Sequence, residues 1–219
     1  HEHVISDSEE ENIEARELIL DVLADPIVEN LSFTMGRWSI RPSMYQKVSD
    51  AIVEGKISVI VTNSLLNANA QARYVHEEKF NSNTVFDVIC LRRATLGHTR
   101  SERIKMAGVI VHECTHAGTD LLALGSMTHL ENEMLSYIAH YSVIWASLEQ
   151  LNARPAESTH NSARARAAWK IAEQVYNNQP ISRWSILELS TSILTDPLYA
   201  RGMFTDSEND GVGRPWIIN

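Results

Sequence analysis

The chain has 219 residues and a formal net charge of −9, with 44% hydrophobic and 21% charged residues. This composition predicts a folded globular domain rather than a disordered chain, and the acidic balance with scattered basic residues excludes nucleic acid as the main partner. No apolar run reaches the roughly 20 residues that a membrane span requires, so we expect a soluble protein with no membrane span.

The first half of the chain predicts a mixture of helices and strands. Ser8 and Glu11 form a capping-box pattern, which indicates a helix that reaches Ala24. Pro42 can open a second helix, which closes at Gly55. Runs rich in β-branched residues are predicted as strands at 56–62, 71–76 and 84–91.

The second half predicts helices alone. Thr99 with Glu102, and Thr128 with Glu131, repeat the capping-box pattern, and apolar residues follow each pair at helical spacing. The predicted helices cover 99–124, 128–151 and 158–177. Each of the first two is long enough to carry functional side chains over several turns.

These elements predict one α+β domain over residues 1–219, in which a small sheet packs beside a helical half. We expect the sheet-containing lobe at 1–97 and the helical lobe at 98–219. A cleft between the two lobes is the natural place for a functional site. The two cysteines, Cys90 and Cys114, are too few for a disulfide framework and are predicted to be buried free thiols.

Residues 112–116 read His-Glu-Cys-Thr-His, an H-E-x-x-H pattern inside the predicted helix 99–124. Residues four apart lie one turn above another, with Cβ atoms about 5–6 Å apart, so His112 and His116 can bind one zinc ion. Glu113 points about 100° away from His112, near enough to contact a water molecule on an open metal position. The pattern therefore predicts two zinc ligands and a general base.

Five residues could complete the zinc site: Asp120, His129, Glu131, Glu133 and His140. Asp120 lies one turn beyond His116, where a carboxylate is better placed to orient an imidazole than to bind the metal. The side chain of Glu131 is needed at the helix N-terminus by the capping box. Glu133 lies early in the second helix of a hairpin and can face the histidines, so we prefer it, with Glu131 as the alternative.

Tyr137 and His140 follow Glu133 at positions i+4 and i+7 and share its helix face. They are candidates for a catalytic role, as hydrogen-bond donors to an oxyanion that develops in the cleft. The alternative is that both are core residues.

Two segments carry a family resemblance. Residues 111–120 read Val-His-Glu-Cys-Thr-His-Ala-Gly-Thr-Asp, which resembles the H-E-x-T-H-A-x-T-D helix of thermolysin-type metallopeptidases, the gluzincins. Residues 132–136 read Asn-Glu-Met-Leu-Ser and resemble the N-E-x-x-S segment of that family. The two segments follow each other in the family's order, and the resemblance as a whole covers about fifty residues.

The resemblance implies a zincin-like fold and a role for each matched residue. The implied zinc ligands are His112, His116 and Glu133, the implied base is Glu113, and the implied support for a histidine is Asp120. It also implies that the strand at 84–91 is the sheet edge that pairs with an extended substrate, although the sequence itself allows an interior strand. The chain departs from the family in having Tyr137 where the family has Asp, and in a shorter link between the two segments.

We therefore expect a zinc-dependent metallopeptidase, a hydrolase that acts on a peptide or protein substrate. One alternative is a zincin-like domain that binds metal or a partner without cleaving anything, as Tyr137 suggests. Another is a delivered effector or toxin protease with one narrow target. The start at His1 rather than Met is consistent with an exported or excised part of a longer protein, so compartment and oligomeric state stay open.

Overall fold

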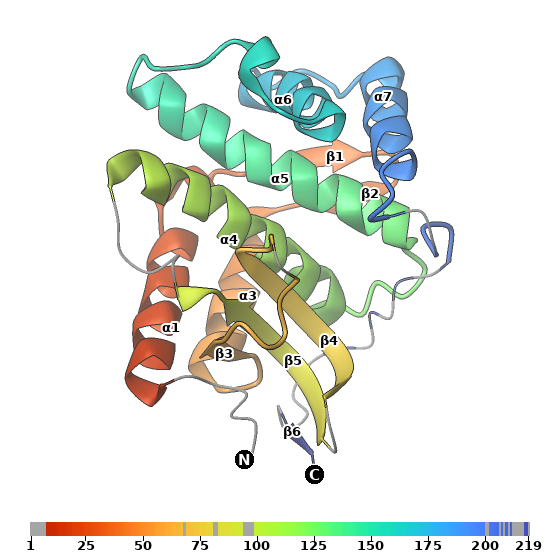
Figure 1. Cartoon of the computed structure of the whole chain (residues 1–219). Helices are drawn as coiled ribbons and strands as arrows, with labels where there is room; N and C mark the ends of the chain where they lie inside the picture. Colours follow the sequence, from red (N-terminus) through yellow and green to blue (C-terminus); the bar gives the residue numbers. More distant parts are fainter. Residues whose placement is uncertain are drawn as a thin grey trace.

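The structure, a computed structural model, describes residues 8–67, 69–80, 83–93, 99–199, 202–205, 207, 209, 211 and 217–218. It is an α+β fold in which a small mixed sheet packs against helices (Figure 1). The strands of this sheet are β3 (Ser58–Val61), β4 (Ala72–Phe80), β5 (Asn83–Leu91) and β6 (Ile217–Ile218). The α+β class and the small mixed sheet predicted from the sequence are confirmed.

Strand β5 lies at the centre of the sheet, so the edge position implied by the resemblance for residues 84–91 is wrong. β3 pairs with β5 in parallel, whereas β4 and β6 pair with it antiparallel. The physical reason is burial: every side chain of β5 from Val85 to Leu91 is buried, as in a strand covered on both faces. β4 carries the charged residues typical of an edge, and among the described residues it pairs only with β5.

Two long helices, α4 (Arg100–Leu121) and α5 (His129–Gln150), lie side by side across the middle of the molecule (Figure 1). Both begin where the capping boxes predicted. Thr99 N donates to Glu102 Oε2 at 3.0 Å. Thr128 N donates to Glu131 Oε2 at 2.8 Å, and Glu131 N donates to Thr128 Oγ1 at 3.1 Å. These bonds satisfy amide groups that have no partner within the helix, and they fix the register of both helices.

The remaining predicted helices are confirmed, with shifts at their ends: α1 (Glu9–Leu23), α3 (Pro42–Val53) and α6 (Ala163–Tyr176). α6 begins later than predicted because Ser162 caps it, after a separate 3-10 turn at Glu157–Thr159. The sequence did not predict α2 (Pro26–Glu29), α7 (Arg183–Leu194), the two-stranded sheet of β1 (Phe33–Met35) and β2 (Trp38–Ile40), or β6. Most of these elements are too short for periodicity to reveal them.

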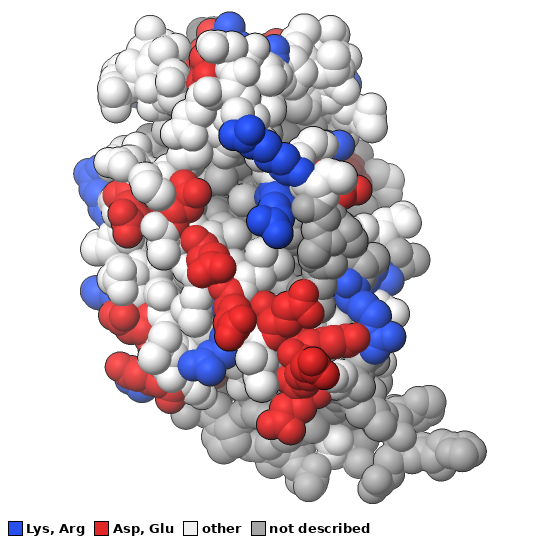
Figure 2. All heavy atoms as spheres, turned by 90° about the vertical axis from the view of Figure 1, so that its left-hand side faces the viewer, with Lys and Arg blue, Asp and Glu red and all other residues white. Residues whose placement is uncertain are grey.

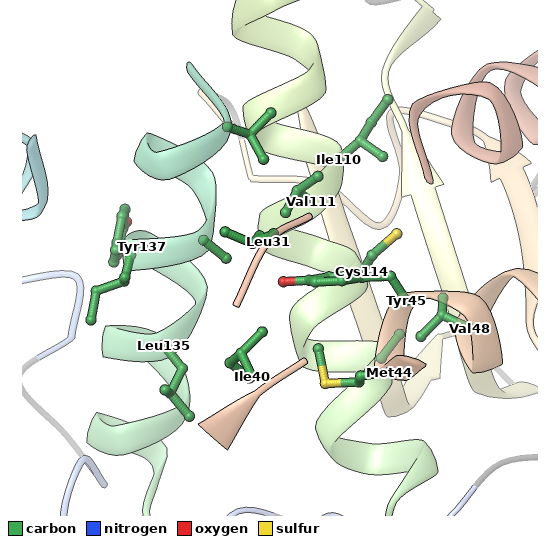
Figure 3. Close-up of a cluster of buried hydrophobic side chains, with 14 of the residues drawn as sticks. Leu31, Ile40, Met44, Tyr45, Val48, Ile110, Val111, Cys114, Leu135 and Tyr137 are labelled. Atoms are coloured by element: carbon green, nitrogen blue, oxygen red, sulfur yellow. The ribbon is translucent and has the colours of Figure 1, made fainter. Parts of the chain in front are cut away.

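One face of α4 is buried against α3 and α5 (Figure 3). Val111 and Cys114 lie in this core, and the hydroxyl of Tyr45 from α3 lies 2.9 Å from Thr115 Oγ1. Because these residues occupy the core side, the helical period turns the side chains of positions 112, 113 and 116 toward the sheet and α5. Cys114 and Cys90 are buried free thiols, as predicted, and burial raises the pKa of both.

The exposed side of α1 carries a strongly acidic surface (Figure 2). Glu14, Glu17 and Asp21 line a groove there whose other wall includes Arg100 and Arg103 of α4. This groove shares no lining residue with the cleft described below. Within the described part of the chain, no helix combines the length and the apolar character needed to cross a membrane.

Candidate metal centre

His112 and His116 project from the same face of α4, one turn apart, and their rings converge. The two Nε2 atoms are 3.2 Å from each other, and the ring planes meet edge to face with centroids 5.0 Å apart. His112 is buried and His116 is half-buried. The helix therefore presents two imidazole nitrogens at one point, which is what the i, i+4 spacing predicts.

Glu133, from the first turns of α5, brings its carboxylate to the same point. Its Oε1 lies 3.4 Å from His116 Nε2 and its Oε2 lies 3.7 Å from His112 Nε2. Ligands of a tetrahedral zinc ion at about 2.0–2.1 Å are about 3.3 Å from one another, so the separations of His116 Nε2 from His112 Nε2 and from Glu133 Oε1 are close to the edges of such a site. Glu133 Oε2 is also buried and accepts no hydrogen bond from the described residues. The three side chains could hold a divalent metal ion.

The surroundings of the two histidine rings suit metal binding. Burial, with smaller effects of His116 and His140, lowers the pKa of His112 well below its usual value, so the ring is neutral. His116 Nδ1 lies 3.1 Å from Asn132 Oδ1, and since an amide oxygen only accepts, Nδ1–H donates. That bond leaves the lone pair of His116 Nε2 facing Glu133 and His112, and it orients the ring as an outer partner of a metal ligand does.

Glu113 lies beside the three candidate ligands, and a hydrogen bond from the sheet holds its carboxylate. The backbone N–H of Tyr74, on the open side of β4, donates to Glu113 Oε2 at 2.6 Å. Burial raises the pKa of Glu113 to about 7, an effect that His116 and the Tyr74 N–H partly offset. A carboxylate with a pKa near neutrality can both accept and return a proton, which is the property a general base needs.

These groups line an open cleft of about 440 Å³ between β4, the two long helices and the C-terminal segment. From β4 it is lined by 72–77, from α4 by His112, Glu113 and His116, and from α5 by His129, Asn132 and Glu133. Tyr199, Ser207 and Asn209 close the opposite side. The candidate metal ligands and Glu113 thus share a space large enough for a segment of a substrate.

The resemblance implied that Asp120 supports a histidine ligand of the zinc ion, but the structure shows its carboxylate next to other residues. Its carboxylate accepts hydrogen bonds from Tyr74 OH at 2.6 Å and from Gly211 N at 3.1 Å, and its Oδ2 lies 3.0 Å from His76 Nδ1. The partner of His116 Nδ1 is Asn132 instead. Asp120 therefore orients a histidine, but that histidine is His76 on the neighbouring strand.

Tyr137 and His140 pack behind His112 and do not line the cleft. Their ring centroids lie 4.7 Å and 5.8 Å from that of His112, and burial lowers the pKa of His140 to about 4. The Tyr137 hydroxyl is 2.7 Å from that of Tyr199, which does reach the cleft. Tyr137 belongs to the buried core, whereas His140 is half-buried.

The two remaining candidates from the sequence, Glu131 and His129, lie at the start of α5. Glu131 caps the helix, and its Oε2 accepts from Thr128 N, so the carboxylate is directed to the helix end. His129 lines the cleft. Of the five residues that could complete the site, the structure brings Glu133 to the histidine pair.

Sequence reasoning missed four residues of the site: Tyr74, His76, Asn132 and Tyr199. Asn132 stands in the segment that resembles a family motif, which was the one available signal. Tyr74 and His76 come from an edge strand and Tyr199 from a segment after α7. Only the tertiary fold brings these three residues to the cleft.

Comparison of the chain with models of protein families, with curated proteins and with solved structures gave no match. The fold and the site define an α+β protein with a candidate metal centre of two histidines and one glutamate.

Proposed function

We propose that the protein is a zinc-dependent metallopeptidase with a zincin-like fold. The observation that carries the proposal is the convergence of His112, His116 and Glu133, whose nearest ligand atoms are 3.2–3.7 Å apart, with Glu113 beside them in an open cleft. Two histidines and a glutamate leave a fourth position open, which is the arrangement of catalytic rather than structural zinc sites. His112, His116 and Glu133 would hold the ion.

Zinc, when bound, supplies Lewis acidity that polarises a carbonyl group and lowers the pKa of a water molecule. Glu113 accepts a proton from this water molecule while the water oxygen forms a bond to the scissile carbonyl carbon. Glu113 then returns this proton to the amide nitrogen as the C–N bond breaks. One water and one peptide bond give a carboxylic acid and an amine, and Glu113 ends in its starting state. Tyr74 N–H holds the carboxylate in place through both transfers.

A peptide substrate is favoured by the strand that borders the cleft. Residues 72–77 of β4 line it, and β4 has no other described strand on that side. The N–H of Tyr74 points to this side, since it reaches Glu113 rather than β5. An extended peptide can add to such an edge through backbone hydrogen bonds, which brings its carbonyl groups past the candidate centre.

The experiment that tests this function is cleavage of a mixed decapeptide library by the purified, zinc-supplemented protein, read by mass spectrometry. We expect new peptide termini to appear, to be lost with 1,10-phenanthroline and to return when zinc is restored. A protein that carries zinc but cleaves neither the library nor casein would contradict the proposal and favour a metal-binding domain without activity.

Asn132 offers a separate prediction, because its Oδ1 is the acceptor for His116 Nδ1. Asn132→Ala should weaken zinc binding about 10- to 100-fold, the usual effect of removing an outer partner of a ligand. Affinity is measured by competition with a zinc-binding dye. Asn132→Asp keeps an acceptor and should bind as well as the wild type. Ser142→Ala, at a buried position further along α5, is the control, and equal affinities in all four proteins would refute the role of Asn132.

A further inference from the structure

A second group of polar side chains lies beside the candidate metal centre, and the proposed mechanism so far makes no use of it. Tyr74 and His76, two residues apart on β4, place their side chains on the same face of the sheet. Both reach one carboxylate of α4: Tyr74 OH donates to Asp120 Oδ2 at 2.6 Å, and His76 Nδ1 lies 3.0 Å from the same oxygen. Asp120 is only 1% exposed.

This group of side chains lies close to the candidate metal centre and is connected to it. Asp120 follows His116 by four residues, so it lies on the same face of α4 about 6 Å further along the helix. Tyr74 joins the two groups directly, because its backbone N–H holds Glu113 while its hydroxyl holds Asp120. His76 lines the same cleft as His112, Glu113 and His116, and its side chain is 19% exposed.

The chemistry of the pair determines what His76 can offer. A carboxylate accepts only, so the bond to Asp120 places a proton on His76 Nδ1 and fixes the ring orientation. In the imidazolium form of His76 the second ring nitrogen also carries a proton, so Nε2–H is a donor while Nδ1–H keeps its bond to Asp120. Tyr74 OH holds the same carboxylate oxygen and thereby limits its movement. The result is a preorganised donor on the strand that borders the cleft.

We propose that His76 is a catalytic residue whose imidazolium form donates a hydrogen bond from Nε2–H to the scissile carbonyl oxygen as that oxygen becomes negative, with Asp120 and Tyr74 positioning the ring. The inference rests on the proposed peptidase function and adds the donor that this function needs. No bond to His76 forms or breaks, and its protons stay in place. Donors preorganised in this way stabilise the transition state more than the bound substrate.

The test compares His76→Ala and His76→Gln with the wild type, all loaded with zinc, on the peptide of the library that the wild type cleaves fastest. We expect kcat to fall about 10²- to 10³-fold in His76→Ala while KM changes little, as after removal of one oxyanion donor. Affinity for a phosphonate analogue of that peptide should fall by a similar factor. His76→Gln keeps a side-chain N–H and should recover part of both losses.

Zinc content and thermal unfolding are measured on the same proteins, with Lys79→Ala, an exposed residue of the same strand outside the cleft, as the control. We expect one zinc per chain and an unchanged kcat in Lys79→Ala. Full activity of His76→Ala would overturn the role of His76 and would leave the proposed peptidase function standing. Two metal ions in the wild type, one of them lost in His76→Ala, would also overturn it and make His76 a ligand together with Asp87 and Asp120. A zinc-loaded wild type that cleaves nothing would instead overturn the proposed function itself.

Discussion

Glu113→Gln is expected to lose peptide hydrolysis while it keeps its zinc and its fold. The amide has nearly the shape of the carboxylate and can still accept the Tyr74 N–H through its oxygen, but it cannot take a proton from water. Removal of a general base costs about 10²- to 10⁴-fold in kcat, and the same residue serves both proton transfers here, so we expect the upper end of that range. The measurement is the rate of library cleavage, with zinc content and thermal unfolding on the same samples.

The control for this prediction is Glu17→Gln, which makes the same chemical change on the exposed side of α1. It should cleave at the wild-type rate. A Glu113→Gln protein that still turns over at the wild-type rate would show that another group takes the proton. In that case the hydrogen bond from Tyr74 N–H to Glu113 would not position a general base.

The helices that carry the site could be predicted from the sequence because their signals are local. The capping boxes at Thr99 and Thr128 gave the starts of α4 and α5 to within one residue. The H-E-x-x-H spacing placed His112 and His116 on one helix face, and the same reasoning left Glu131 at the helix end and Glu133 on the inner side. Each of these steps depends on contacts within one or two turns.

The strand that borders the cleft could not be predicted in the same way. Alternating residues indicate that a strand exists, but not which strand lies at the edge, since this depends on pairing between distant segments. The edge strand beside the cleft is β4 and not β5, to which the resemblance gave that position, and with β4 came Tyr74 and His76. Asp120 shows the same limit, because its place on α4 was predicted correctly while its partners came from β4.

The third ligand is the residue on which the account depends most. Glu133→Ala would leave two imidazoles, which is too few donors to hold zinc tightly in the open cleft, so the ion should be lost on dialysis. Glu131→Ala removes the reciprocal bond of the capping box and should lower the free energy of unfolding by about 1 kcal/mol, without loss of zinc. The two glutamates are two residues apart, so they form a matched pair.

Metal content by mass spectrometry on the wild type, Glu133→Ala and Glu131→Ala is therefore the most direct test of the zinc centre. We expect about one zinc ion per chain in the wild type and in Glu131→Ala, and close to none in Glu133→Ala. A wild-type protein that holds no zinc after supplementation would contradict this expectation, and so would a Glu133→Ala protein that keeps the ion.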